Sequence, residues 1–193
     1  MVQLTEQQTL RFQSFEDYLA YDDDSDRLYE LFNGELIEVP PESGLNVEIA
    51  NLFFALFLPI VGHRKIRGHG LELEVQGEPK NRYPDLTIIR DEHIEQLKKR
   101  NTIRLSMAPP LLVMEVVSPG AIQRDRDYIA KRSQYEAVGI PEYWLIDLAR
   151  REMTVFRDPQ AGGYRTKTIV IAGEIRPVAF PELAIAVEQI IAP

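Results

Sequence analysis

Residues 111–118, LLVMEVVS, form a continuous apolar run interrupted by one carboxylate, Glu115. A second run, YPDLTIIR at residues 83–90, carries Asp85 near its start. Short runs of this kind are typical of central strands that are buried on both faces. An isolated carboxylate in such a strand is costly unless a partner neutralises it, so both acids need an explanation.

The two carboxylates are expected to meet. Side chains alternate along a strand, so Glu115 and Val117 share one face while Val116 points the other way. If the two strands are neighbours, Asp85 and Glu115 meet at the strand ends and repel each other. A divalent cation resolves that conflict, and Mg²⁺ prefers hard oxygen ligands, keeps several waters and binds phosphate. We therefore predict a Mg²⁺ site, with Mn²⁺ as a substitute, held by Asp85, Glu115 and the Val116 carbonyl.

The rest of the chain alternates helix and strand signals. Asn33-Gly34 supplies the positive φ angles of a two-residue turn and predicts an N-terminal β-hairpin. Apolar side chains at helical spacing predict a long helix over residues 45–61. Further helices are expected at residues 14–21 and 124–138, and further strands at 71–75, 141–147, 153–157 and 166–171. This order predicts an α/β (α+β) fold, a central mixed sheet flanked by helices, in one domain over residues 1–193.

The composition excludes several classes of protein. The chain has no cysteine, so disulfides, thiolate metal sites and cysteine nucleophiles are excluded. Its first residues, MVQLTEQQTLRF, lack the basic and apolar regions of a signal peptide. The longest apolar stretch, residues 52–61, is shorter than the ~20 residues that a membrane span needs. We expect a cytoplasmic protein without membrane contact.

The charge is distributed unevenly. The net charge of −8 argues against binding to a polyanion, which normally needs a basic surface. Residues 1–50 hold 12 acidic and 2 basic side chains, whereas residues 51–193 hold 18 acidic and 20 basic ones. The acidity therefore lies in the N-terminal quarter, and the region with the two carboxylates remains compatible with an anionic substrate.

The predicted helix at 124–138 carries Asp127, Lys131 and Tyr135 along one face, because they are spaced four residues apart. A lysine near the two carboxylates suits an anionic substrate, since its ammonium group orients a water or stabilises a developing charge. Asp127 either positions Lys131 or forms a surface pair with it. Tyr135 is expected to pack against the core with its hydroxyl in water. The three histidines show no metal-ligand spacing, so zinc and serine–histidine chemistry are poorly supported.

The order of these motifs resembles a known family. Pro84-Asp85 followed by Glu115-Val116-Val117 is similar to the PD-(D/E)XK nuclease superfamily, although valine replaces its usual lysine at position 117. Lys131 on the following helix, with Glu142-Tyr143-Trp144 beyond it, resembles the Uma family of endonucleases, formerly a domain of unknown function. One departure is Asn46, where family members often carry histidine.

The resemblance implies a restriction-endonuclease-like fold and a metal-dependent endonuclease that hydrolyses DNA as a homodimer. It implies that Asp85 and Glu115 bind the metal, that Lys131 is the catalytic lysine and that Glu48 is an auxiliary acid. Two alternatives stay open. One is a nucleic-acid or protein interaction module with little turnover, and the other is a metal-dependent hydrolase of another anionic substrate. Taken alone, Lys131 is more often a solvated helix lysine, and the resemblance is what favours a catalytic role.

Overall fold

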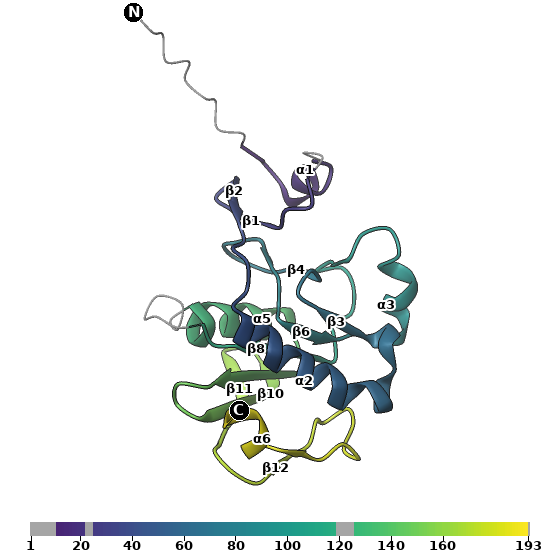
Figure 1. Ribbon diagram of the computed structural model, residues 1–193. Helices are drawn as coiled ribbons and strands as arrows, with labels where there is room; N and C mark the ends of the chain where they lie inside the picture. Colours follow the sequence, from purple (N-terminus) through teal and green to yellow (C-terminus); the bar gives the residue numbers. More distant parts are fainter. Residues whose placement is uncertain (1–10, 22–24, 119–125, 193) are drawn as a thin grey trace, which may run out of the picture.

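The computed structural model describes residues 11–21, 25–118 and 126–192. Its centre is a mixed sheet of six strands in the order β11-β10-β9-β8-β6-β3, in which only β8 and β9 are parallel (Figure 1). Helices cover the sheet, and a hairpin precedes it, which confirms the predicted architecture. Residues 1–10, which carry most of the stretch tested for a signal peptide, lie outside the described part.

The elements fall into the central sheet, its helices and three small sheets. The central strands are β3 (Ile66–Gly68), β6 (Leu86–Ile88), β8 (Leu112–Val116), β9 (Glu142–Asp147), β10 (Glu152–Gln160) and β11 (Gly163–Val170). The helices are α1 (Phe15–Leu19), α2 (Gly44–Val61), the 3₁₀ turn η1 (His63–Lys65), α3 (Asp91–Gln96), the π-helix η2 (Arg126–Lys131), α5 (Arg132–Val138) and α6 (Glu188–Ile191). The small sheets pair β1 (Tyr29–Phe32) with β2 (Glu35–Glu38), β4 (Glu72–Glu74) with β5 (Asn81–Arg82) and β7 (Thr102–Ile103), and β12 (Glu174–Ile175) with β13 (Ile185–Ala186).

The two faces of the central sheet belong to two separate cores. On β8, Met114 packs with Phe53 and Phe57 of α2, whereas Val113 packs with Tyr135 of α5. This alternation follows from the period of two along a strand. Glu115 therefore points to the face of the sheet that α5 covers, and α5 begins directly after Lys131.

The segment before β6 differs from the prediction of one strand over residues 83–90. Asn81 and Arg82 form β5, which pairs with β4 in a separate three-stranded sheet, and β6 begins only at Leu86. Pro84 lies between them, and a proline has no amide hydrogen to donate to a sheet. Asp85 consequently sits at the junction of two sheets.

Helix α2 is the longest and most apolar helix among the described residues. Its length and a mean hydropathy of 1.8 match a membrane span by composition alone, and it is the single such helix in the described part of the chain. Ile49, Phe53, Phe57 and Val61 recur along one side and pack into the core above the sheet. That side of α2 has the contacts of a core helix, while its opposite side faces outward.

The N-terminal hairpin is confirmed at the predicted turn. Asn33 and Gly34 both have positive φ angles, 50° and 80°. The carbonyl of Gly34 accepts a hydrogen bond from Phe12, and a side chain at Gly34 would lie 2.7 Å from the Phe12 oxygen. The hairpin is held to β5 because Arg82 donates two hydrogen bonds of 3.1 Å to the carboxylate of Glu30.

Candidate active site

The structure brings Asp85 and Glu115 together at the ends of neighbouring strands. Leu86 of β6 lies opposite Met114 of β8 in an antiparallel register, so one step outward places Asp85 opposite Glu115. The Val116 amide donates a 2.6 Å hydrogen bond to Oδ2 of Asp85. Both acids are buried, with 6% and 1% of their surface exposed. Each therefore needs a nearby positive charge or donor.

Glu115 finds its partners on η2 and α5. Lys131 donates to its Oε2 over 2.7 Å, and the Tyr135 hydroxyl donates to its Oε1 over 2.5 Å. Lys131 also lies 3.3 Å from Oδ1 of Asp127, which is itself buried. We call these four residues, Glu115, Asp127, Lys131 and Tyr135, the lysine cluster. The expectation that the Tyr135 hydroxyl reaches water is wrong, because that hydroxyl is buried against Glu115.

The pKa values of Lys131 and Asp85 are both raised, which favours the charged form of the lysine and the neutral form of the aspartate. Burial opposes a charge on Lys131, but Glu115 and Asp127 raise its pKa, so the ammonium form is kept. Burial and then the charge of Glu115 raise the pKa of Asp85 well above its usual range, and Lys131 offsets this only in part. Asp85 is thus a carboxylate that lacks sufficient positive charge from the protein itself.

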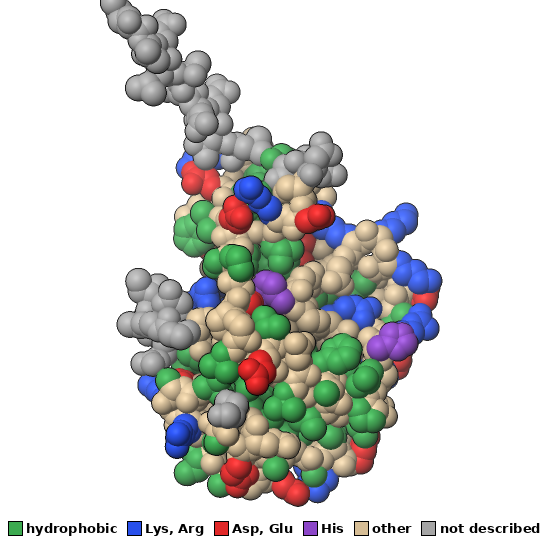
Figure 2. Space-filling model, viewed as in Figure 1, with side chains coloured by type: hydrophobic (Ala, Val, Ile, Leu, Met, Phe, Trp, Pro, Cys, Tyr) green, Lys and Arg blue, Asp and Glu red, His purple; other side chains and the backbone are tan. Residues whose placement is uncertain are grey.

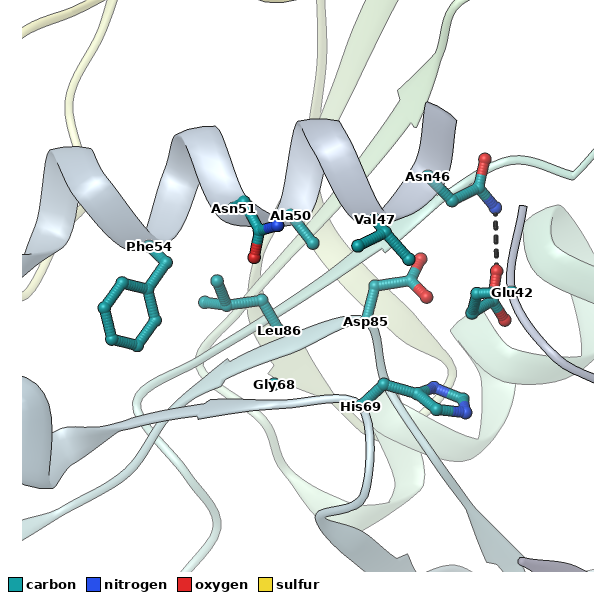
Figure 3. Close-up of a pocket in the computed structure, with 10 residues that line it drawn as sticks. All are labelled: Glu42, Asn46, Val47, Ala50, Asn51, Phe54, Gly68, His69, Asp85 and Leu86. Atoms are coloured by element: carbon teal, nitrogen blue, oxygen red, sulfur yellow. Dashed lines mark hydrogen bonds between the residues drawn. The ribbon is translucent and has the colours of Figure 1, made fainter. Parts of the chain in front are cut away.

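A second group of ligand atoms converges on Asp85 from the other side. Glu42, His69 and Asp85 each offer one ligand atom, and these atoms lie within 4.8 Å of one another. Asn46 of α2 donates a 2.9 Å hydrogen bond to Oε2 of Glu42 and so fixes that carboxylate (Figure 3). Partial desolvation lowers the pKa of His69, which favours the neutral imidazole that binds metals. We call Glu42, His69 and Asp85 the cavity cluster.

The cavity cluster fits a divalent cation by its donor set. Ligand atoms around one cation at 2.0–2.3 Å lie roughly 3 to 4.6 Å apart, close to the separation found here. The two carboxylates suit both Mg²⁺ and Mn²⁺, whereas the imidazole favours Mn²⁺ because imidazole binds transition metals readily. The residues present therefore fit a divalent metal without specifying which one.

The two clusters border the same hollow. A cavity of about 100 Å³ lies between α2 and the sheet and is lined by the cavity cluster (Figure 3). A second cavity of about 250 Å³ is also lined by Glu42 and His69, and it continues to Lys131 and Arg126. A substrate placed in this hollow faces carboxylates at one side and cationic groups at the other.

The structure does not bring Glu48 into this hollow. Glu48 lies exposed on α2 and lines neither of the two cavities. Sequence reasoning missed Glu42 and His69, which come from a loop before α2 and from a turn after β3. A signal was present for His69, because glycines flank it on both sides and allow close approach of a ligand. The departure at Asn46 also gains a physical role, as the tether of Glu42.

Comparisons with known proteins show the family and the fold of this chain. The model of the Uma2 family, described as "Putative restriction endonuclease", matches residues 15–188. A crystal structure described as a "putative nuclease belonging to DUF820" from Anabaena variabilis ATCC 29413 superposes with a TM-score of 0.65. The two chains are 16% identical, and the match covers 92% of this chain and 96% of that one, so it establishes a shared fold. A search of curated proteins returned no match.

Proposed function

The chain belongs to the Uma2 family of restriction-endonuclease-like proteins, and from this membership we propose that it is a metal-dependent endonuclease hydrolysing DNA phosphodiester bonds. One observation carries the proposal. Asp85 is buried, has a raised pKa and lines one cavity with Glu42 and His69, and these two residues also line the second cavity, which reaches Lys131. Such a perturbed acid in a cavity is typical of a functional site.

Asp85, Glu42 and His69 would hold the cation, which is Mg²⁺ in this proposal with Mn²⁺ as a substitute. Glu115 and the Val116 carbonyl would complete the set if the lysine cluster rearranges when the metal binds. A bound divalent cation supplies Lewis acidity and lowers the pKa of a coordinated water. Asn46 orients Glu42, and the hydrogen bond from Val116 orients Asp85.

Lys131 would neutralise charge on the phosphate. Glu115 and Asp127 keep its ammonium group protonated, and the side chain reaches the larger cavity. A fixed ammonium group beside a developing negative charge lowers the barrier because it needs little reorganisation during the reaction. Glu48 stays a prediction from the family resemblance, as an auxiliary acid outside these cavities.

The test is cleavage of single-stranded and duplex DNA in Mg²⁺ or Mn²⁺ by the purified protein. Asp85→Asn and Lys131→Met are expected to lower the rate at least 100-fold, while the exposed matched controls Asp158→Asn and Lys98→Met keep it. Cleavage that persists in both site variants rejects the assignment. Circular dichroism checks that both site variants are folded under the conditions of the assay, and loss of cleavage in the controls as well also rejects the assignment.

A catalytically weak interaction module is the second candidate. It is favoured by Glu115, because Lys131 and Tyr135 already occupy both of its carboxylate oxygens. Titration of the protein with Mn²⁺ in a calorimeter separates the two. Binding heat that disappears in Asp85→Asn supports the enzyme, whereas no heat in the wild-type protein supports the module.

We further propose that the protein works in the cytoplasm as a single-domain unit that forms a homodimer. Hydrophobic side chains gather over α2 on the face seen in Figure 2, and such surface is typical of contact sites. Light scattering at increasing protein concentration measures the mass. A monomer mass at the highest concentration contradicts the dimer.

A further inference from the structure

The smaller cavity has two chemically different halves. One half is the cavity cluster, with its carboxylates and imidazole. The other half continues along α2 past Ala50 to Phe54, with Leu86 of β6 as its floor (Figure 3). A metal and a phosphate would occupy only the polar half, so they give no role to the apolar half.

The apolar half is a slot rather than a closed core. Val47 is 44% exposed and Phe54 is half-buried, so both present apolar surface to solvent at the slot wall. Gly68 of the edge strand β3 leaves open space, since a side chain added there meets no atom within 4 Å. Ala50 is also small. Small residues opposite one aromatic ring leave room for a flat group.

Asn51 adds a polar group at this slot. The side chain of Asn51 is exposed and points from α2 toward the cavity in Figure 3, and its amide has no hydrogen-bond partner among the described residues. An asparagine amide offers one acceptor and two donors in a plane. Ligand sites commonly combine apolar walls with a few such groups that fix orientation.

We propose that this slot binds the base of a nucleotide next to the phosphate held at the cavity cluster, unstacked from its neighbours. The proposal deepens the proposed nuclease function and rests on it. A base has a flat apolar face for Phe54 and a polar edge for Asn51. The cavity of about 100 Å³ is smaller than the apolar cavity of about 150 Å³ that holds benzene, so it takes one edge of a single base while the rest of the ring lies at the open side, and it excludes a base pair.

The substrate class follows from this geometry. A base inside a duplex is stacked and paired, so it reaches a pocket only after it leaves the stack. A single-stranded or locally unpaired strand has already met that cost. The protein therefore prefers unpaired nucleic acid, and its edge strand β3 and helix α2 form the walls that receive the strand.

The binding test needs no cleavage. A short single-stranded DNA with one 2-aminopurine is titrated with the full-length protein in Ca²⁺, a hard cation that binds oxygen ligands, and its fluorescence is quenched when the base stacks on an aromatic ring. Phe54→Leu keeps apolar packing but removes the aromatic face, and Ala50→Leu fills the slot. Each is expected to weaken binding roughly tenfold. Phe32→Leu makes the same change at an exposed aromatic ring outside the cavity, so it is the matched control and is expected to bind as the wild type.

Mn²⁺ binding measured on the same variants confirms that they are folded and that the cavity cluster is intact. Unchanged quenching in Phe54→Leu and Ala50→Leu overturns the slot, as does a duplex that binds as tightly as the single strand. The slot is also overturned if Phe54→Leu or Ala50→Leu changes the oligomeric mass of the protein but not its DNA binding, because a second copy of the chain then covers α2. Duplex cleavage that is indifferent to both variants rejects the slot and leaves the nuclease. Quenching without any cleavage in Mg²⁺ or Mn²⁺ rejects the nuclease and leaves the slot.

Discussion

The lysine cluster and the cavity cluster lie beside each other, and each contains two carboxylates and one basic side chain. In the lysine cluster, both oxygens of Glu115 receive hydrogen bonds, and Lys131 lies between two acids. In the cavity cluster, the described residues donate one bond to Asp85 and one to Glu42, and the other oxygens face a cavity. The first cluster is electrostatically complete within the chain, whereas the second lacks positive charge.

The largest effect is expected when the complete cluster loses its cation. Lys131→Met leaves Glu115 buried with only the Tyr135 hydroxyl, and breaking a buried ion pair on one side costs about 3–5 kcal/mol. Chemical denaturation measures the loss in the free energy of unfolding. The double variant Glu115→Gln with Lys131→Met is expected to recover part of it. If Lys131→Met is as stable as the wild type, the lysine cluster does not depend on its own cation, and the contrast with the cavity cluster fails.

The next effect concerns the tether of Glu42. Asn46→Ala removes the donor to this carboxylate, and loss of such supporting groups typically lowers metal affinity about 10- to 100-fold. Calorimetry with Mn²⁺ measures the affinity. Asn46→Asp adds a third carboxylate to those of Glu42 and Asp85 and replaces the donor to Glu42. It should therefore hold the Glu42 carboxylate less firmly, without the loss of volume that alanine brings. Equal affinities in the wild type and both variants remove Glu42 from the cavity cluster.

Asp85→Asn is expected to stabilise the metal-free protein by about 0.5–2 kcal/mol, at the cost of metal binding. The amide oxygen still accepts from Val116, while the repulsion from Glu115 is lost. The pH dependence gives the sign. Since the folded-state pKa of Asp85 is raised, its contribution to stability is present below the unfolded pKa of about 3.9 and is lost as pH rises through the folded value. The variant should lack this fall, and thermal unfolding in EDTA across pH tests it.

The smallest effect is expected at Glu48. Glu48→Gln should leave Mn²⁺ affinity unchanged because the side chain is exposed and lines neither cavity, whereas Glu42→Gln should lower it. Measuring affinity and cleavage side by side separates two roles. A Glu48→Gln variant that binds metal normally but cleaves at least tenfold more slowly supports the auxiliary acid implied by the family resemblance.

Sequence reasoning succeeded where one local signal was strong. The apolar runs of β8 and β9 and the Asn33-Gly34 turn were predicted because burial and positive φ leave direct marks in the residue types. Strand β3 was missed, since three residues that end in glycine show no periodicity. The direction of the Tyr135 hydroxyl was missed because a helix face indicates what is buried but not which strand residue lies opposite.

The candidate site shows the same division. Asp85 and Glu115 stood out as acids within apolar runs, so their proximity was predicted on the condition that the two strands are neighbours, and the register of β6 with β8 meets that condition. Glu42 and His69 were not, because they approach Asp85 from separate segments through tertiary packing. No local pattern encodes that convergence.

The π-helix η2 gives the pairing of Asp127 with Lys131 some tolerance to a change in chain length. Arg126–Lys131 is wound more loosely than the α-helix that follows, so it contains one residue more than a regular turn would need. Deleting one residue between Asp127 and Lys131 would restore regular winding and leave the two residues three apart, a spacing at which side chains of an α-helix still share one face. The ion pair should therefore survive a one-residue deletion here, whereas substitution of either charged side chain removes it.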